Sequence, residues 1–572
     1  MRKEAREAPV SLLPAWLSGG PVGLSTIGLI VGTLFFAASL SPSLVPRTWT
    51  MQGVLSGLSL AAGYGTGVAL RWCWSYLELP VPSRRVQRVL LALAAVACLA
   101  VAVIFLRQAS DWQNSIRVIM DMETVDTARP FRVALLALPL FAAILMFSRA
   151  FLFTFRVISA RLHRHIPRRI SHGLGVVLAV ALFWSVIDGV LLAALMRGLD
   201  TSFQQFDALM EPEVAAPDDP TRTGSAASLV DWNTLGRTGR NFVSSGPGLD
   251  TLRAFHGEGV LKPIRVYVGL NSAEDIRARA RLAVDELERT GAFERAVLVI
   301  ATPTGTGWLD PSAIDTLEFL HRGDVATVAL QYSYLPSWLS LLSEEEYGAE
   351  SARALFEAVY GRWTQLPRDA RPRLYLHGLS LGALNSERSA DLFDVIADPF
   401  HGALWSGPPF RSQAWRTITA SREPDSPAWL PRFRDSSIVR FTNQYNTLEV
   451  PGARWGPIRI VYLQYASDPV TFFEPQAFYR QPEWMAPPRG PDVSDSLRWY
   501  PVVTMLQLAI DVAAADEAPM GFGHIYAPEH YIDAWLAVTD PPDWSPADIA
   551  RLKAWFRTRS DRAPPDTPVS RP

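Results

Sequence analysis

A serine between two glycines is the feature of this sequence best suited to do chemistry. Residues 378–382 read Gly-Leu-Ser-Leu-Gly, which is the G-x-S-x-G pattern of a nucleophile elbow centred on Ser380. A strand-to-helix turn this sharp strains the serine backbone and exposes its hydroxyl, and flanking glycines leave the room that the turn needs. An apolar, strand-like run, 373–376, precedes the pattern, and a helix-compatible run, 383–388, follows it. Ser380 is therefore predicted to be a catalytic nucleophile.

A serine hydroxyl is a poor nucleophile unless a base takes its proton and an acid orients that base. With an elbow of this kind, the acid and then the histidine follow the serine along the chain. Asp468 comes shortly after the strand-like segment Ile458–Tyr465, and His524 follows Gly523 just before a predicted helix, Pro528–Val538. We therefore predict that Asp468 is the acid and His524 the base.

Other acids and histidines fit these roles less well. His530 falls within the predicted helix, and His377 lies only three residues before the serine, so both are expected to be structural. His401 precedes the acid, which is the wrong order. Glu474 is the main alternative to Asp468. Three further acids follow the elbow helix too closely to be the usual partner: Asp391, Asp394 and Asp398.

The negative charge that develops during attack on a carbonyl needs two backbone N–H donors, which form an oxyanion hole. One is expected from Leu381, the residue after the serine, and the other from a loop after an earlier strand. Residues 302–308, Thr-Pro-Thr-Gly-Thr-Gly-Trp, follow the predicted strand Ala296–Ala301. Because the proline has no N–H, Thr304 or Gly305 is the expected second donor. A phosphate-binding loop is excluded, since no Lys-Ser/Thr pair follows these glycines.

Strand-like and helical runs alternate from about residue 260 onward, and the strands are almost wholly apolar. This pattern predicts a mostly parallel sheet covered by helices on both faces. A polar linker is expected over 198–240, the catalytic domain over 241–558 and a Pro-rich disordered tail over 559–572. The expected strands are Ile264–Leu270, Ala296–Ala301, Val325–Tyr332, Arg373–Leu376, Ala403–Trp405 and Ile458–Tyr465, and the helices between the first of them are Ala273–Thr290, Ala313–Leu320 and Glu346–Trp363.

Residues 1–197 are predicted to form a transmembrane helical domain with five spans, each close to the ~20 residues that cross a bilayer. Basic residues gather at the N-terminus and in the second and fourth loops, so the N-terminus is expected in the cytoplasm. An odd number of spans then places the catalytic domain outside the cell membrane. Asp188 in the fifth span is either a functional carboxylate or an interhelical hydrogen-bond partner. The spans are expected at Val22–Leu40, Val54–Leu70, Val89–Leu106, Val133–Phe151 and Leu174–Met196.

The composition excludes several classes of function. With 54 basic and 56 acidic residues the net charge is −2, so no electrostatic footprint for nucleic acid is present. The two cysteines, Cys73 and Cys98, support neither a disulfide framework nor a cysteine-ligated metal. Nineteen tryptophans and 49 % hydrophobic residues agree instead with a membrane protein. No cofactor is implied, and the oligomeric state is not defined.

The elbow and the order of the three candidate residues make the region from about 240 to 550 resemble the α/β-hydrolase superfamily. The whole chain resembles bacterial membrane-bound α/β-hydrolase-like proteins, in which a multi-span N-terminal region precedes the catalytic domain. Other segments that carry this resemblance are Leu44–Arg47 with Gln52-Gly53, residues 304–308, and Ala527–Tyr531. The resemblance implies an α/β-hydrolase fold and a serine hydrolase, but no settled substrate.

These features predict a membrane-anchored serine hydrolase that cleaves an ester or thioester, with a lipid-like substrate as one option. Acyl transfer by the same triad is the nearest variant, because an alcohol can replace water in resolving the acyl-enzyme. A hypothesis of another class is a membrane transport or scaffolding protein whose hydrolase-like domain only binds. An intact candidate triad argues against it. Three apolar stretches could form a lipid-facing cap or belong to the core: Trp338–Leu342, Trp484–Pro488 and Tyr500–Val512.

Overall fold

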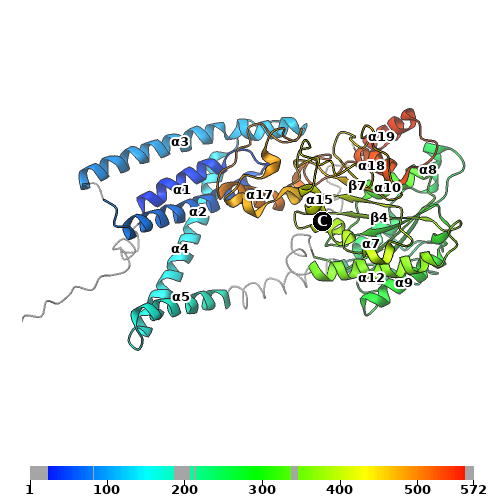
Figure 1. Ribbon diagram of the computed structural model, residues 1–572, viewed down its shortest axis with the longest axis horizontal. Helices are drawn as coiled ribbons and strands as arrows, with labels where there is room; N and C mark the ends of the chain where they lie inside the picture. The colour runs from blue at the N-terminus through cyan, green and yellow to red at the C-terminus, as the bar shows by residue number, and fades with distance from the viewer. Residues whose placement is uncertain (1–23, 81–82, 186–206, 212–213, 336–344, 561–572) are drawn as a thin grey trace, which may run out of the picture. The chain divides into compact units, whose positions relative to one another are not determined.

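The chain forms two compact units, which we call the helical unit and the sheet unit. The helical unit contains the chain up to Val186 together with two later segments, Glu474–Pro482 and Val493–Ala514. The sheet unit contains the rest, so the chain contributes to the helical unit twice more after the sheet has begun. The computed structural model describes residues 24–80, 83–185, 207–211, 214–335 and 345–560 (Figure 1).

Glycines let the first two helices of the helical unit pack closely. These helices are α1 (Thr26–Ser39) and α2 (Trp49–Tyr76). A Cβ atom added at Gly63 would lie 2.8 Å from Phe35, and one added at Gly67 would lie 2.7 Å from a carbonyl oxygen of α1. The glycine-rich second span is therefore a helix-packing surface, which is the usual role of small residues in such segments. The next helices are α3 (Arg84–Ile119), α4 (Pro130–Leu162) and α5 (Arg168–Trp184).

Three helices in the described part of the chain are long and apolar enough to cross a membrane: α2, α3 and α4. The prediction of five spans is therefore not met there. The helix α1 has 14 residues, which is short of the ~20 that a span needs, and α5 has 17 residues in its described part. The fifth predicted span, Leu174–Met196, ends outside the described residues, and Asp188 also lies outside them.

A helix from the second half of the chain, α17 (Val503–Ala513), is part of the helical unit (Figure 1). Its Asp511 carboxylate accepts a hydrogen bond of 2.8 Å from Ser43 Oγ and lies 3.4 Å from the Nε atom of Arg47. Both side chains of this ion pair are fully buried. The apolar stretch Tyr500–Val512 thus packs within the helical unit, where the motif Leu44–Arg47 provides its polar partners.

The sheet unit is built on seven parallel strands in the order β1-β3-β2-β4-β5-β7-β6. Its strands are almost entirely buried, which explains their continuous apolar sequences. Six of them coincide with predicted strands, and β6 was not predicted. The strands are β1 (Ile264–Val268), β2 (Val297–Thr302), β3 (Val325–Leu330), β4 (Arg373–Leu379), β5 (Gly402–Ser406), β6 (Val439–Thr442) and β7 (Arg459–Leu463).

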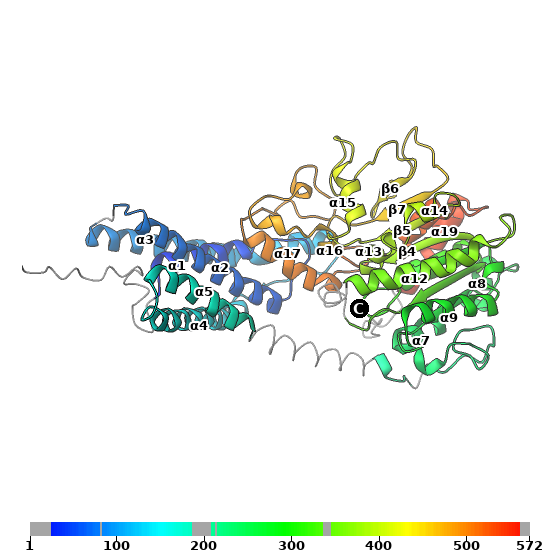
Figure 2. The ribbon, with the colours of Figure 1, turned by 60° about the horizontal axis from the view of Figure 1, so that its bottom comes forward.

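Helices cover both faces of this sheet, as predicted (Figure 1). One face carries α9 (Ile276–Arg289) and α12 (Glu345–Thr364), which run along the sheet in Figure 2. The other carries α10 (Pro311–Leu320) and α18 (Pro528–Thr539). Each packs through an apolar stripe of the kind that helical periodicity produces. The shorter or peripheral helices are α7 (Gly236–Ser244), α8 (Leu249–His256), α13 (Leu381–Glu387), α14 (Leu392–Val395), α15 (Gln413–Ala420), α16 (Pro469–Phe472) and α19 (Pro546–Ser560).

The segment expected as a free polar linker, 198–240, is folded onto the sheet unit in its described part. The buried carboxylate of Glu286 in α9 accepts hydrogen bonds from Thr223 Oγ1 at 3.0 Å, Ser228 Oγ at 2.8 Å and the Leu229 N–H at 3.0 Å. The serines and threonines that suggest a linker in the sequence therefore satisfy a buried charge. At the other end, α19 continues to Ser560, two residues beyond the predicted end of the catalytic domain at 558.

Candidate active site

The predicted elbow is a strained turn between β4 and α13. Ser380 has φ +57° and ψ −124°, a conformation that a residue with a side chain rarely adopts. A Cβ atom at Gly378 would overlap the backbone of Gly382, and one at Gly382 would overlap the carbonyl oxygen of Thr302. The Ser380 N–H donates a 3.0 Å hydrogen bond to the carbonyl of Ser406 at the end of β5. Both glycines are thus required by contact, and β5 holds the strained serine in place.

The predicted acid and base are hydrogen-bonded to each other. His524 Nδ1 lies 2.7 Å from Asp468 Oδ2, although 56 residues separate them. Asp468 is fully buried, and its Oδ1 accepts the N–H of Val470 at 2.8 Å and that of Thr471 at 3.3 Å. The hydroxyl of Tyr526 donates a further 2.7 Å hydrogen bond to Oδ2. These donors hold the carboxylate in place, so that it can fix the imidazole with the proton on Nδ1.

The ion pair tunes the basicity of His524. Burial opposes a positive charge on the imidazole, but the charge of Asp468 and its hydrogen bond outweigh burial and raise the pKa of His524 above its ordinary value. A base with a pKa near neutrality combines the correct protonation state with sufficient driving force for proton transfer. The electrostatics of the pair therefore suit a general base.

The other ring nitrogen of His524, Nε2, is buried. It has no hydrogen-bond partner within the described residues, and so it is not bonded to Ser380. Gly407 has φ +49°, and a Cβ atom there would lie 2.7 Å from Cε1 of His524, the carbon between the two ring nitrogens. The end of β5 thus binds the Ser380 backbone through Ser406 and supports the imidazole through the next residue. A hydrogen bond between a catalytic serine and its base is often long or poorly aligned before substrate binds, and it tightens during the reaction.

The two predicted sources of the oxyanion hole lie against each other, since the position of a Gly382 Cβ would be 3.1 Å from the carbonyl oxygen of Pro303. The N–H of Thr304, however, donates a 2.9 Å hydrogen bond to the carbonyl of Trp308 within its own loop. In this conformation the N–H of Thr304 is used within its own glycine-rich turn, and it is therefore not available to an oxyanion. Gly305 and Leu381 remain the candidate donors.

A family model described as "Alpha/beta-hydrolase family" matches residues 264–552, the region that holds the sheet, Ser380, Asp468 and His524. The chain belongs to this α/β-hydrolase family. A second model, "Alpha/beta-hydrolase family N-terminus", matches residues 40–247. No curated protein and no solved structure matches the chain.

The competing histidines of this α/β-hydrolase chain have structural roles. His530 Nδ1 accepts a 2.5 Å hydrogen bond from the hydroxyl of Tyr465, and burial lowers the pKa of His530 to about 4. His377 is bonded through Nδ1 to the carbonyl of Leu404 at 2.9 Å, and burial lowers its pKa to about 4 as well. His401 Nδ1 accepts the N–H of a strand residue at 3.1 Å. Each therefore fixes local structure as a neutral imidazole.

The competing acids also lie elsewhere in the hydrolase-family chain. Glu474 begins the first late segment of the helical unit, whereas Asp468 and His524 belong to the sheet unit. Asp398 is bound to Arg371, with one of the two hydrogen bonds at 2.7 Å. Asp391 accepts the N–H of a nearby residue at 3.0 Å. Nothing is described for the side chain of Asp394.

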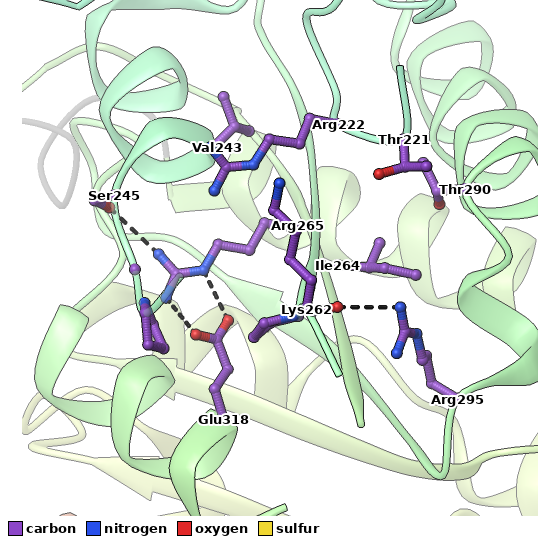
Figure 3. A pocket seen from close by; sticks show the side chains of 13 residues that line it. Thr221, Arg222, Val243, Ser245, Lys262, Ile264, Arg265, Thr290, Arg295 and Glu318 are labelled. Atoms are coloured by element: carbon purple, nitrogen blue, oxygen red, sulfur yellow. Dashed lines mark hydrogen bonds and ion pairs between the residues drawn. The ribbon is translucent and has the colours of Figure 1, made fainter. Parts of the chain in front are cut away.

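A charged pocket lies at the opposite, amino-terminal edge of the hydrolase sheet (Figure 3). Lys262 and Arg265 reach it from the start of β1, and Arg295 from just before β2. Arg265 is held by Glu318 at 2.7 Å and by Asp315 at 2.6 Å. No histidine or cysteine is among the 13 residues that line the pocket. Its paired charges tie β1 to α10, and Ser380, Asp468 and His524 follow the carboxyl ends of their strands or precede α18, at the other edge.

Two hydrogen-bonding residues of the site were missed by the sequence analysis. Tyr526, which binds Asp468, lies only two residues after His524, so an inspection of the short Gly-His-Ile-Tyr run could have suggested it. Asp492, which binds Ser467 next to the acid, follows Asp468 by 24 residues in a segment with no periodic pattern. No local signal identifies Asp492.

Proposed function

We propose that this protein is a serine hydrolase that cleaves an ester or thioester through an acyl-enzyme. The observation that carries this proposal is the 2.7 Å hydrogen bond between His524 Nδ1 and Asp468 Oδ2, with the open Nε2 supported by the same end of β5 that holds Ser380. A protein that only binds has no need of a strained serine and an oriented, open imidazole together.

The mechanism follows from these roles. His524 Nε2 takes the proton of Ser380 as its Oγ attacks the substrate carbonyl carbon, and the charge of Asp468 stabilises the imidazolium. In this mechanism the N–H groups of Leu381 and Gly305 stabilise the tetrahedral oxyanion. The imidazolium then gives its proton to the leaving alcohol or thiol, and the acyl-enzyme remains. Water, deprotonated by His524, releases the acid. An alcohol in place of water would make the protein an acyltransferase.

A fluorophosphonate probe tests the nucleophile directly, because it phosphorylates an activated serine. The full-length protein in detergent should be labelled, and Ser380→Ala should not. Ser437→Ala is a matched control, since the Ser437 hydroxyl binds Asp435 in a surface turn away from the candidate site. Absence of labelling in folded wild-type protein would reject the hydrolase and favour a binding role. Competition by esters of different chain length would then define the acyl group, including a lipid-like one.

The helical unit supports anchoring of this activity to a membrane. Three helices in the described part, α2, α3 and α4, have the length and apolar character of spans. Basic residues favour a cytoplasmic N-terminus, and an odd number of spans places the sheet unit outside the cell. Reporters fused after residue 558 test this placement: alkaline phosphatase should be active and green fluorescent protein dark. The opposite result would place the hydrolase in the cytoplasm.

A further inference from the structure

The acid and the base come from loops that are distant in the sequence, so something must fix their separation. Asp468 follows β7, and His524 precedes α18. One buried carboxylate, that of Asp492, is bound to the residues beside both. Asp492 is 2 % exposed, and its Oδ2 accepts hydrogen bonds from the N–H of Ser467 at 3.0 Å and from the Ser467 hydroxyl at 2.6 Å.

The Ser467 hydroxyl continues this connection to the base. Because it donates its hydrogen to Asp492, its oxygen can accept the N–H of Gly523 at 2.9 Å. Ser467 immediately precedes the acid, and Gly523 immediately precedes the base. The chain Asp492–Ser467–Gly523 therefore links the two loops one residue away from each functional side chain.

A second connection reaches the same loop from β6. The side-chain amide of Gln444 donates to Asp492 Oδ2 at 2.8 Å and to the carbonyl of Gly521 at 3.2 Å. Asp492 Oδ2 thus accepts three donors, two from Ser467 and one from Gln444. A carboxylate oxygen can accept several donors at once, and hydrogen bonds to a charged acceptor are roughly twice as strong as neutral ones.

From this geometry we propose that Asp492 is a positioning residue, which holds the loops of Asp468 and His524 at the separation that proton transfer needs. The inference rests on the proposed hydrolase function. Asp492 touches neither acid nor base, so it acts through Ser467 and Gln444. Its role is distinct from that of Tyr526, which binds Asp468 itself.

Asp492→Asn tests this role with little change in shape. An amide oxygen can still accept these donors, but without the charge, so the two loops should loosen. For a misplacement of about 1 Å, kcat should fall on the order of 10²-fold. The KM for a p-nitrophenyl ester should stay the same, because no substrate-binding group is altered. Hydrogen–deuterium exchange in the full-length protein should accelerate in peptides that cover 521–526 and stay unchanged in those that cover β4.

The matched control is Asp435→Asn. Asp435 also accepts the N–H and the hydroxyl of a serine, Ser437, at 3.1 and 2.7 Å, but it lies at the surface. This variant should keep wild-type kcat and exchange. Ser467→Ala keeps Asp492 and removes only the hydroxyl that bridges to Gly523, so it should lower kcat in the same direction, by about tenfold for one lost hydrogen bond.

The outcomes separate this proposal from the hydrolase itself. If kcat and KM of Asp492→Asn equal those of wild type, Asp492 is not a positioning residue. If Asp492→Asn is destabilised throughout, Ser467→Ala decides, and its normal kcat would overturn the proposal. If wild type shows neither labelling nor ester hydrolysis, the proposed function fails. In that case hydrogen–deuterium exchange over 521–526 in Asp492→Asn still decides whether Asp492 fixes the two loops.

Discussion

Each unit of this protein contains a buried pair of one acidic and one basic side chain, and the two pairs differ in which atom is left without a hydrogen bond. In the helical unit, Arg47 lies against Asp511 with its Nε 3.4 Å from the carboxylate. In the sheet unit, His524 lies 2.7 Å from Asp468. Both pairs join segments that are far apart in the sequence.

Both terminal nitrogens of Arg47 form hydrogen bonds, whereas its buried Nε has the 3.4 Å ion pair with Asp511 and no hydrogen-bond partner among the described residues. Nη1 of Arg47 donates to Gln52 Oε1 at 2.9 Å and to the carbonyl of Ser39 at 3.2 Å. Nη2 donates to Ser43 Oγ at 2.7 Å and to a second carbonyl at 3.1 Å. These four hydrogen bonds, together with the ion pair to Asp511, provide the kind of partners that a buried charge requires for stability. The motif Leu44–Arg47 therefore provides groups that bind α17 within the helical unit.

The His524–Asp468 pair is saturated on the acid and open on the base. Asp468 accepts donors on both oxygens, whereas Nε2 of His524 has no partner among the described residues. Arg47 Nε also lacks a hydrogen bond, but it lies 3.4 Å from the Asp511 carboxylate. In His524 the unbonded nitrogen is the one that a general base uses, because Asp468 binds the other. The comparison teaches that the position of an unbonded nitrogen, more than its presence, distinguishes a reactive pair from a structural one.

The largest expected effect on activity comes from removing Nε2 of His524. His524→Ala should lower ester hydrolysis by about 10⁶-fold, the scale of losing a triad base elsewhere. His530→Ala is the matched control, because its imidazole only accepts the hydroxyl of Tyr465. It should keep activity within about tenfold and cost ~1–3 kcal/mol of stability for the hydroxyl left unpaired. Hydrolysis of a p-nitrophenyl ester and thermal unfolding would measure both. The reverse pattern would exchange the two assignments.

The next effect concerns the acid. Asp468→Asn should fold normally and lower kcat by about 10⁴-fold. With the amide oxygen accepting the N–H groups of Val470 and Thr471, the amide nitrogen faces His524 Nδ1 and the hydroxyl of Tyr526. Both then lose their acceptor, and the imidazole turns to the wrong tautomer. Circular dichroism and steady-state kinetics would check this. Near-normal activity would move the role to another acid, with Glu474 the first to test.

In the helical unit the expected effect is on stability. Arg47→Met leaves Asp511 buried without its cation, which should cost about 3–5 kcal/mol of the free energy of unfolding. The double variant with Asp511→Leu should recover much of this loss, because an apolar pair of similar volume often replaces a buried ion pair. Urea unfolding in detergent would measure both. If the single variant is as stable as wild type, the Arg47–Asp511 pair does not stabilise the helical unit.

The sequence predicts most of the sheet and the reactive residues because short local patterns in the sequence indicate both. Runs such as Val325–Tyr332 are apolar throughout, as strands buried on both faces require. The strand β6, Val-Arg-Phe-Thr, escapes this criterion because it has only four residues, and two of them, Arg440 and Thr442, are polar. Arg440 is tolerated there because its guanidinium donates to the carbonyl of Ser436 at 2.8 Å and stacks 3.9 Å from the ring of Trp455.

What the sequence does not predict depends on contacts between distant segments. The apolar sequence of a helix such as α17 indicates that the helix packs against another element. The periodicity does not identify the unit to which that element belongs. Asp492 has no neighbour in sequence that marks it as the third member of a hydrogen-bond chain. The order serine, acid, histidine was enough to select Ser380, Asp468 and His524, because that order follows from the connections of the fold.

The smallest expected effect concerns Tyr526, whose hydroxyl shares Asp468 Oδ2 with His524. Tyr526→Phe removes this donor and keeps the aromatic contact with Tyr465, whose ring centroid lies 4.4 Å away. Asp468 keeps its backbone donors on Oδ1 and its bond to the imidazole. The expected loss in kcat is therefore only about tenfold, the scale of one hydrogen bond to a charged group.

The pH profile of Tyr526→Phe gives a sharper test than its rate. Without the phenol, more of the negative charge on Oδ2 is available to His524, so its pKa, already raised by Asp468, should rise further. Asp310 and Asp516, which also raise the pKa of His524, are unchanged by this variant. Only the neutral imidazole acts as a base, so activity is lost as the pH falls through this pKa. The acidic limb of kcat/KM should therefore move to higher pH, and a shift to lower pH would mean that Tyr526 supports the ion pair instead of weakening it.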